Sequence, residues 1–125
     1  AAEQAFWEGV KSIKAGAPLS EYSRTVQNFV EGQGFSVVRN LVGHGVGKEL
    51  HEDPYVPNFY DKKDSSLRLE EGMTLALEPM INAGSFQTIL AKDGWVFRTK
   101  DGKLSAHYEN TVLVTENGAE VLTVF

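Results

Sequence analysis

The run MTLALEPMI, Met73 to Ile81, decides the fold class, because it is an apolar segment of strand length and three further strand-like segments follow it. The segments GWVFRTK (94–100), AHYENTVLVT (106–115) and AEVLTVF (119–125) follow, and glycine-containing turn sequences such as DGW, KDGK and ENG lie around them. Strand-like runs bounded by turn residues are typical of hairpins. The second half of the chain is therefore predicted to form an antiparallel meander.

The first half of the chain has helical periodicity instead. Apolar residues at helical spacing predict an amphipathic helix over residues 2–15. A second helix is expected to follow with Ser20 as its N-cap and with Gly32 and Gly34 at its end. A short β-branched strand, FSVVR (35–39), comes next. Two helices followed by a mostly antiparallel sheet make an α+β fold.

Composition narrows the class of protein. The 125 residues can form a single unit with a modest core. A net charge of −5 argues against nucleic acid as a main partner, because phosphate binding needs a basic face. The sequence contains no cysteine, which fits a reducing, cytoplasmic location, and no apolar run long enough to span a membrane. We therefore expect a cytoplasmic protein that binds neither nucleic acid nor a membrane.

The stretch LVGHGVGKELHEDP, Leu41 to Pro54, holds two of the three histidines in a glycine-rich loop. His44 stands between two glycines, where the backbone can approach a ligand or a metal closely. His51 does not belong to an HExxH helix, because Pro54 would break that helix. Two roles fit His51 equally well: a loop histidine that bonds local carbonyls, or a catalytic histidine. His107 is expected to be structural and to face solvent or the sheet edge.

Two glutamates stand in apolar strand segments. Glu78 closes MTLALEP, and Glu109 begins ENTVLVT on the same strand side as His107. Glu78 alone fits a strand-end residue that reaches solvent. If the two strands are neighbours, however, both carboxylates converge on one face, where they repel each other unless a cation lies between them. With the His44 imidazole they would form a nitrogen and oxygen site suited to manganese, iron, cobalt or zinc.

Three ordered motifs, GFSVVRNLVGHGVGKELHEDP, LEEGMTLALEPMINAG and DGWVFRTKDGKLSAHYENTVLVT, strongly resemble the C-terminal half of type I methionine aminopeptidases. The resemblance covers essentially all of residues 1–125 and implies half of the pita-bread fold, in which two similar α+β halves enclose a two-metal site. Prolidases and creatinases share that fold, but an arginine tends to stand where this chain has His107. Trp95, which follows Asp-Gly, also resembles the methionine enzymes.

The resemblance implies a role for each candidate residue. Three residues match the family's metal ligands: His44, Glu78 and Glu109. Glu78 also matches the general base. Glu109 matches the ligand that bridges two divalent ions, which are cobalt, manganese, iron or zinc. His51 matches the histidine that contacts the scissile amide and stabilises the tetrahedral intermediate. Leu50 and Trp95 match positions that line the methionine pocket. The implied activity is metal-dependent removal of the N-terminal methionine from nascent proteins.

Part of the family's site is missing from this sequence. The family needs two aspartate ligands from its N-terminal half, and no aspartate of this chain lies in such a motif, so three of five ligands are present. We therefore expect an incomplete site, inactive alone, that needs the N-terminal half or a second copy of the chain as partner. A non-catalytic binding or assembly module and a stand-alone mononuclear hydrolase are the alternatives.

Overall fold

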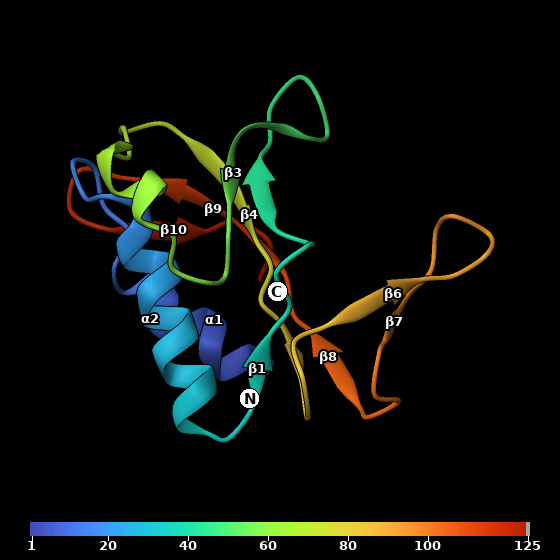
Figure 1. Cartoon of the computed structure of the whole chain (residues 1–125). Coiled ribbons are helices and arrows are strands. Elements are labelled where there is room, and N and C mark those ends of the chain that lie inside the picture. The colour runs from blue at the N-terminus through green and yellow to red at the C-terminus, as the bar shows by residue number, and fades with distance from the viewer. Residues whose placement is uncertain (125) are drawn as a thin grey trace.

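Two helices lie side by side, and a two-stranded hairpin projects from the other side of the molecule (Figure 1). The computed structural model describes residues 1–124, in which α1 (Ala2–Val10) and α2 (Leu19–Gly32) pack against each other. The larger sheet has the strand order β10-β9-β4-β2-β3, the smaller has β1-β5-β8, and β6 and β7 form a separate hairpin. The strands are β1 Ser36–Val37, β2 Gly43–Gly45, β3 Glu52–Val56, β4 Thr74–Leu77, β5 Met80–Asn82, β6 Thr88–Leu90, β7 Phe97–Thr99, β8 Ser105–His107, β9 Asn110–Val114 and β10 Ala119–Val121. The predicted α+β class is confirmed.

The helix boundaries correct two predictions. The predicted helix over 2–15 is wrong beyond Val10, because the Ser12 hydroxyl and backbone N–H both donate to the carbonyl of Gly9 and turn the chain. Ile13 is nevertheless buried in that turn, which explains why the apolar pattern ran on. The predicted N-cap Ser20 is also wrong, because α2 begins at Leu19 after Pro18 and buries Ser20. The end of α2 at Gly32 is confirmed.

The strands pair antiparallel throughout, but not as a meander. β9 pairs with β4, and β4 pairs with β2, so segments distant in sequence are neighbours. β3 and β6 and a short 3₁₀ turn at Lys62–Ser66 were not predicted. The predicted strand over 119–125 is formed at Ala119–Val121, and its last residue, Phe125, lies outside the described residues.

Two of the predicted strands are each divided between the two sheets. MTLALEPMI breaks at Glu78 and Pro79, so that β4 belongs to the larger sheet and β5 to the smaller one. The second break, at Tyr108 and Glu109, separates β8 from β9 in the same way. Proline has no N–H to give to a ladder, which suits position 79 to such a break. Both glutamates therefore lie where the chain passes from one sheet to the other.

The core lies between the helices and the larger sheet. Its fully buried side chains include Phe6 and Tyr22 from the helices and Leu75, Leu77 and Val112 from β4 and β9. This packing fixes the helix-facing side of β4 and leaves the opposite side for other groups. Within residues 1–124, no helix combines the length and apolarity that crossing a membrane requires.

Candidate functional site

His44 lies in the middle of a strand, not in the loop that the glycines had suggested. β2 runs between β3 and β4, and all three of its residues are buried. A Cβ atom at Gly43 would collide with the carbonyl oxygen of Ala76, and one at Gly45 with that of Asp53. The glycines are therefore needed for the close approach of neighbouring strands, whereas the sequence had suggested an approach to a ligand.

The ring of His44 has a defined orientation. Its Nδ1 lies 2.9 Å from the carbonyl oxygen of Gly45, so Nδ1 carries the proton and donates it. Nε2 then points at Oε1 of Glu78 over 3.1 Å. In the neutral ring Nε2 carries a lone pair and is an acceptor. It therefore faces a second acceptor, the Glu78 carboxylate, unless a proton or a metal cation binds between the two. A histidine that donates Nδ1–H to a backbone carbonyl and presents Nε2 is the usual arrangement of a metal ligand.

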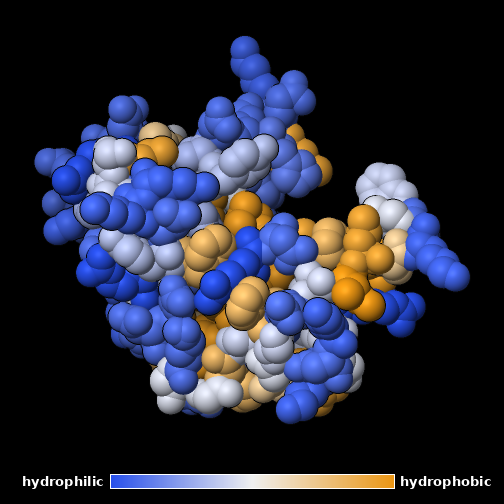
Figure 2. Space-filling view, viewed as in Figure 1, coloured by the Kyte–Doolittle hydropathy of each residue, from blue (hydrophilic) through white to orange (hydrophobic). Residues whose placement is uncertain are grey.

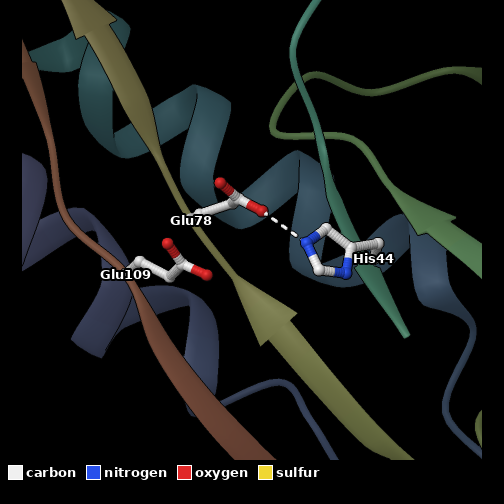
Figure 3. Close-up of side chains that lie close together, drawn as sticks. All are labelled: His44, Glu78 and Glu109. Atoms are coloured by element: carbon white, nitrogen blue, oxygen red, sulfur yellow. Dashed lines mark ion pairs between the residues drawn. The ribbon is translucent and has the colours of Figure 1, made fainter. Parts of the chain in front are cut away.

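Glu78 directly follows β4 and Glu109 directly precedes β9, and both side chains approach His44 of β2. One ligand atom from each of the three residues lies within 4.8 Å of the other two, and Figure 3 shows the side chains pointing toward one another from three neighbouring strands. Glu78 and His44 are buried, whereas Glu109 is exposed. The predicted convergence of these residues on one face is confirmed.

The charge of Glu78 is poorly stabilised by the protein alone. Burial and then the neighbouring Glu109 carboxylate raise the pKa of Glu78 above its ordinary value, and His44 and His107 partly offset this effect. Two carboxylates and an imidazole with a free lone pair form a donor set that a divalent cation neutralises. The residues present therefore fit a metal ion, and together they offer nitrogen and oxygen ligands of the kind that zinc and the other transition metals accept.

His107 lies beside this cluster: its side chain is exposed, as predicted, but its ring also contacts the carboxylates, which adds to the structural role expected of it. Its Nε2 lies 3.1 Å from Oε2 of Glu78 and 3.9 Å from Oε2 of Glu109. Strand alternation had already placed His107 on the same side as Glu109, and that signal was sufficient to find it. The ring is half-exposed, and the pairing of His107 on β8 with Met80 on β5 also brings it beside Glu78.

His51 and Trp95 lie beside the cluster. The His51 ring is stacked near that of His44, with 4.2 Å between ring centres. A hollow of about 560 Å³ is lined by both of these histidines together with Glu78, Trp95 and His107. Leu50, in contrast, is 75% exposed and is not among the described residues that line this hollow.

A buried polar network supports Glu78 from behind, and no sequence pattern had indicated it. The side-chain amide of Asn58 donates to the backbone carbonyl of Glu78 over 3.2 Å, and the Tyr22 hydroxyl donates to Oδ1 of Asn58 over 3.3 Å. Burial, and to a smaller extent the charge of Glu78, raises the pKa of Tyr22 well above its usual range, so this hydroxyl stays protonated. Helix α2 is thereby linked to the break between β4 and β5.

Known proteins are similar to this chain in both sequence and fold. The chain is 48% identical over 122 residues to a methionine aminopeptidase of Clostridium perfringens, covering 98% of this chain and 49% of that protein. The crystal structure of methionine aminopeptidase from Thermotoga maritima superposes with a TM-score of 0.93 at 46% identity, and that from Rickettsia prowazekii with 0.94 at 40%. Each covers 98% of this chain, which itself covers 49% and 50% of those chains. This chain thus spans about half the length of these relatives.

The match to a family model extends over nearly the whole chain. The model for metallopeptidase family M24 matches residues 1–116, which include His44, Glu78, His107 and Glu109. The clustered histidine and glutamates therefore lie within the matched region. The chain belongs to metallopeptidase family M24.

Proposed function

We propose that this chain supplies part of the active site of a methionine aminopeptidase, which removes the N-terminal methionine from nascent proteins. The observation that carries the proposal is the convergence of His44, Glu78 and Glu109 within 4.8 Å on adjacent strands, beside a hollow. The methionine aminopeptidases among its relatives support the same activity. The chain would correspond to the C-terminal half of such an enzyme.

The three clustered residues are the proposed metal ligands. His44 would bind through Nε2, and Glu78 and Glu109 through carboxylate oxygens, with Glu109 shared between two ions. Divalent cobalt, manganese, iron and zinc all accept this donor set. Metal ions bound in such a site lower the pKa of a water molecule and polarise a peptide carbonyl. Burial and the neighbouring Glu109 carboxylate raise the pKa of Glu78, and a carboxylate with a raised pKa accepts a proton more readily, which supports a role as general base.

Other residues are assigned to the substrate. His51 lies against His44 and would contact the scissile amide and stabilise the tetrahedral intermediate. Trp95 lines the hollow and would contact the methionine side chain, as would Leu50 once a substrate or partner covers it. The hollow contains both imidazole and apolar surface, which suits an unbranched thioether beside a peptide bond.

A partner is part of the proposal, because two expected aspartate ligands are absent from the sequence. Either the N-terminal half of the enzyme or a second copy of this chain would cover the open side of the site. Apolar residues on the β6–β7 hairpin support this view, since Ile89, Leu90, Trp95 and Val96 are all exposed. Figure 2 shows apolar surface gathered over that hairpin and toward the body of the molecule. A cytoplasmic location is proposed from the cysteine-free sequence.

Hydrolysis of a Met-Gly-Met peptide tests the proposal. The purified chain with divalent cobalt or manganese should show little turnover, and adding the N-terminal half of a methionine aminopeptidase should restore it. Glu78→Gln in the restored pair should abolish it. Turnover by the chain alone that is lost in Glu78→Gln would favour the mononuclear hydrolase. Absence of turnover in the pair, together with binding of the half, would favour the non-catalytic assembly module.

A further inference from the structure

Both oxygens of the Glu78 carboxylate face a histidine. Oε1 lies 3.1 Å from Nε2 of His44, and Oε2 lies 3.1 Å from Nε2 of His107. The side chain of Glu78 is only 11% exposed, whereas that of His107 is 46% exposed. A mostly buried carboxylate is therefore held between a buried ring on β2 and a half-exposed ring on β8.

The two rings differ in what they can offer. His44 has an acceptor at each nitrogen, because Nδ1 meets the carbonyl of Gly45 and Nε2 meets Glu78. The Nε2 of His107 meets carboxylate oxygens of both Glu78 and Glu109, at 3.1 and 3.9 Å. Ionised carboxylates only accept hydrogen bonds, and within the described residues the hydrogen bond of the His107 ring is made at Nε2, so its neutral ring carries the proton there, whereas the proton of His44 is held at Nδ1 by Gly45. His44 consequently presents a lone pair to the cluster and His107 presents an N–H.

We propose that His107 is a positioning residue, whose Nε2–H holds Oε2 of Glu78 and so keeps Oε1 turned toward His44 and the ion-binding side. This inference rests on the proposed function and deepens it. In this arrangement His107 is a donor behind the ligand, not a ligand itself. Donors that orient a metal-binding carboxylate typically change metal affinity by about 10- to 100-fold when they are removed.

The position of the ring supports this assignment. His107 pairs across the sheet with Met80, two residues beyond Glu78, so the backbone ladder of β5 and β8 fixes the ring beside the carboxylate. Among residues 1–124, the side-chain contacts of the Glu78 carboxylate go to His44 and His107, so no other described donor stands ready to replace His107. The ring also lines the hollow, where a movement of Glu78 would alter the shape of the site.

Titration of the full chain with Co²⁺ tests the assignment, by calorimetry together with the visible absorption of the bound ion. His107→Ala should weaken Co²⁺ binding by about 10-fold or more. His107→Gln, whose amide N–H can reach Oε2, should recover most of the affinity and give the absorption band of the unmodified chain. Ser105→Ala, on the same strand, should bind like the unmodified chain, and thermal unfolding should confirm that each variant is folded.

The outcomes separate this inference from the proposed function. If the unmodified chain binds no Co²⁺, the proposed metal site fails and the role of His107 fails with it. If it binds and His107→Ala binds equally well, only the role of His107 is overturned. A shifted band and weak binding in both His107 variants would make His107 a direct ligand and also overturn it. NMR of the metal-free chain gives a second measurement, in which a neutral His107 ring protonated at Nδ1 would contradict the proposal.

Discussion

Leu77 of β4 lies directly opposite Asn110 of β9 in the antiparallel ladder. Their chain neighbours Glu78 and Glu109 follow at the end of that ladder, where the chain passes into the smaller sheet. Cross-strand neighbours lie about 5 Å apart on one face, and like charges placed there destabilise a sheet. The fold therefore holds two carboxylates together by backbone pairing, at a cost in stability that a bound cation would remove.

Glu109→Gln should stabilise the metal-free chain while weakening its binding of Co²⁺. The substitution removes the repulsion between two carboxylates and keeps the shape of the side chain. The expected gain in the free energy of unfolding at pH 7 is up to about 1 kcal/mol, measured by urea denaturation with a chelator present. Glu116→Gln, at an exposed turn, serves as the matched control and should change neither quantity. A less stable Glu109→Gln chain would contradict the account of repulsion.

Gly43→Ala should destabilise the sheet, because the added Cβ would meet the carbonyl oxygen of Ala76 on β4. A backbone oxygen cannot move without disturbing the ladder, so the expected loss is roughly 2–3 kcal/mol. Gly118→Ala is the matched control, since a Cβ there meets nothing within 4 Å. Urea denaturation of both variants measures the difference. Equal stability of the two would show that β2 and β4 are not as close as described.

Asn58→Ala should leave two buried groups unpaired, the hydroxyl of Tyr22 and the backbone carbonyl of Glu78. Each such group costs about 1–3 kcal/mol, so a total loss near 3 kcal/mol is expected. Asn28→Ala, exposed on α2, is the control and should be close to neutral. Tyr22→Phe should cost less than Asn58→Ala, because it leaves the amide bonded to Glu78. The reverse order in denaturation experiments would refute the linkage.

Asp101 is expected to make stability depend on pH in the acid range. The backbone N–H of Lys103 and then that of Ser85, at 3.0 and 2.8 Å, lower the pKa of Asp101 below its ordinary 3.8. A lowered folded pKa means that the unfolded chain binds the proton more readily. The stabilisation is therefore present above pH 3.8 and is lost as the pH falls through the folded pKa. The stability difference between the unmodified chain and Asp101→Asn should shrink over that window, and a constant difference would contradict this.

Sequence patterns predicted the buried elements well and their partners less well. The periodic spacing of apolar residues located both helices and the strands β4 and β9, because residues that face the core recur at the period of the helix or strand. The patterns overran where an apolar residue is buried in a turn, as at Ile13, and they missed β3, which contains Pro54 and acidic residues. Alternation brought Glu78 and Glu109 to one face once the strands were assumed to be neighbours.

The remainder of the site depends on contacts that no local pattern encodes. Asn58 lies in an irregular polar stretch, and only the packing of α2 brings Tyr22 to it. His107 meets Glu78 because β8 pairs with β5, which is a property of sheet topology. The short spacing of the glycines around His44 indicated close approach correctly, but the neighbour they approach is another strand. Contacts between segments distant in sequence, not local propensity, determine the positions of these residues.

The last prediction is that the chain does not remain a monomer by itself. The β6–β7 hairpin exposes Leu90 and Val96 as well as Trp95, which is 86% exposed, and such apolar surface is a site for association. Sedimentation should show an average mass that rises with concentration, and the double substitution Leu90→Ser and Val96→Ser should reduce the rise. Leu122→Ser, near the end of the chain, is the control. The N-terminal half should compete with self-association, since both would cover the same open side of the site. A mass that stays monomeric at all concentrations, in a chain that binds no N-terminal half, would show that this surface needs no partner.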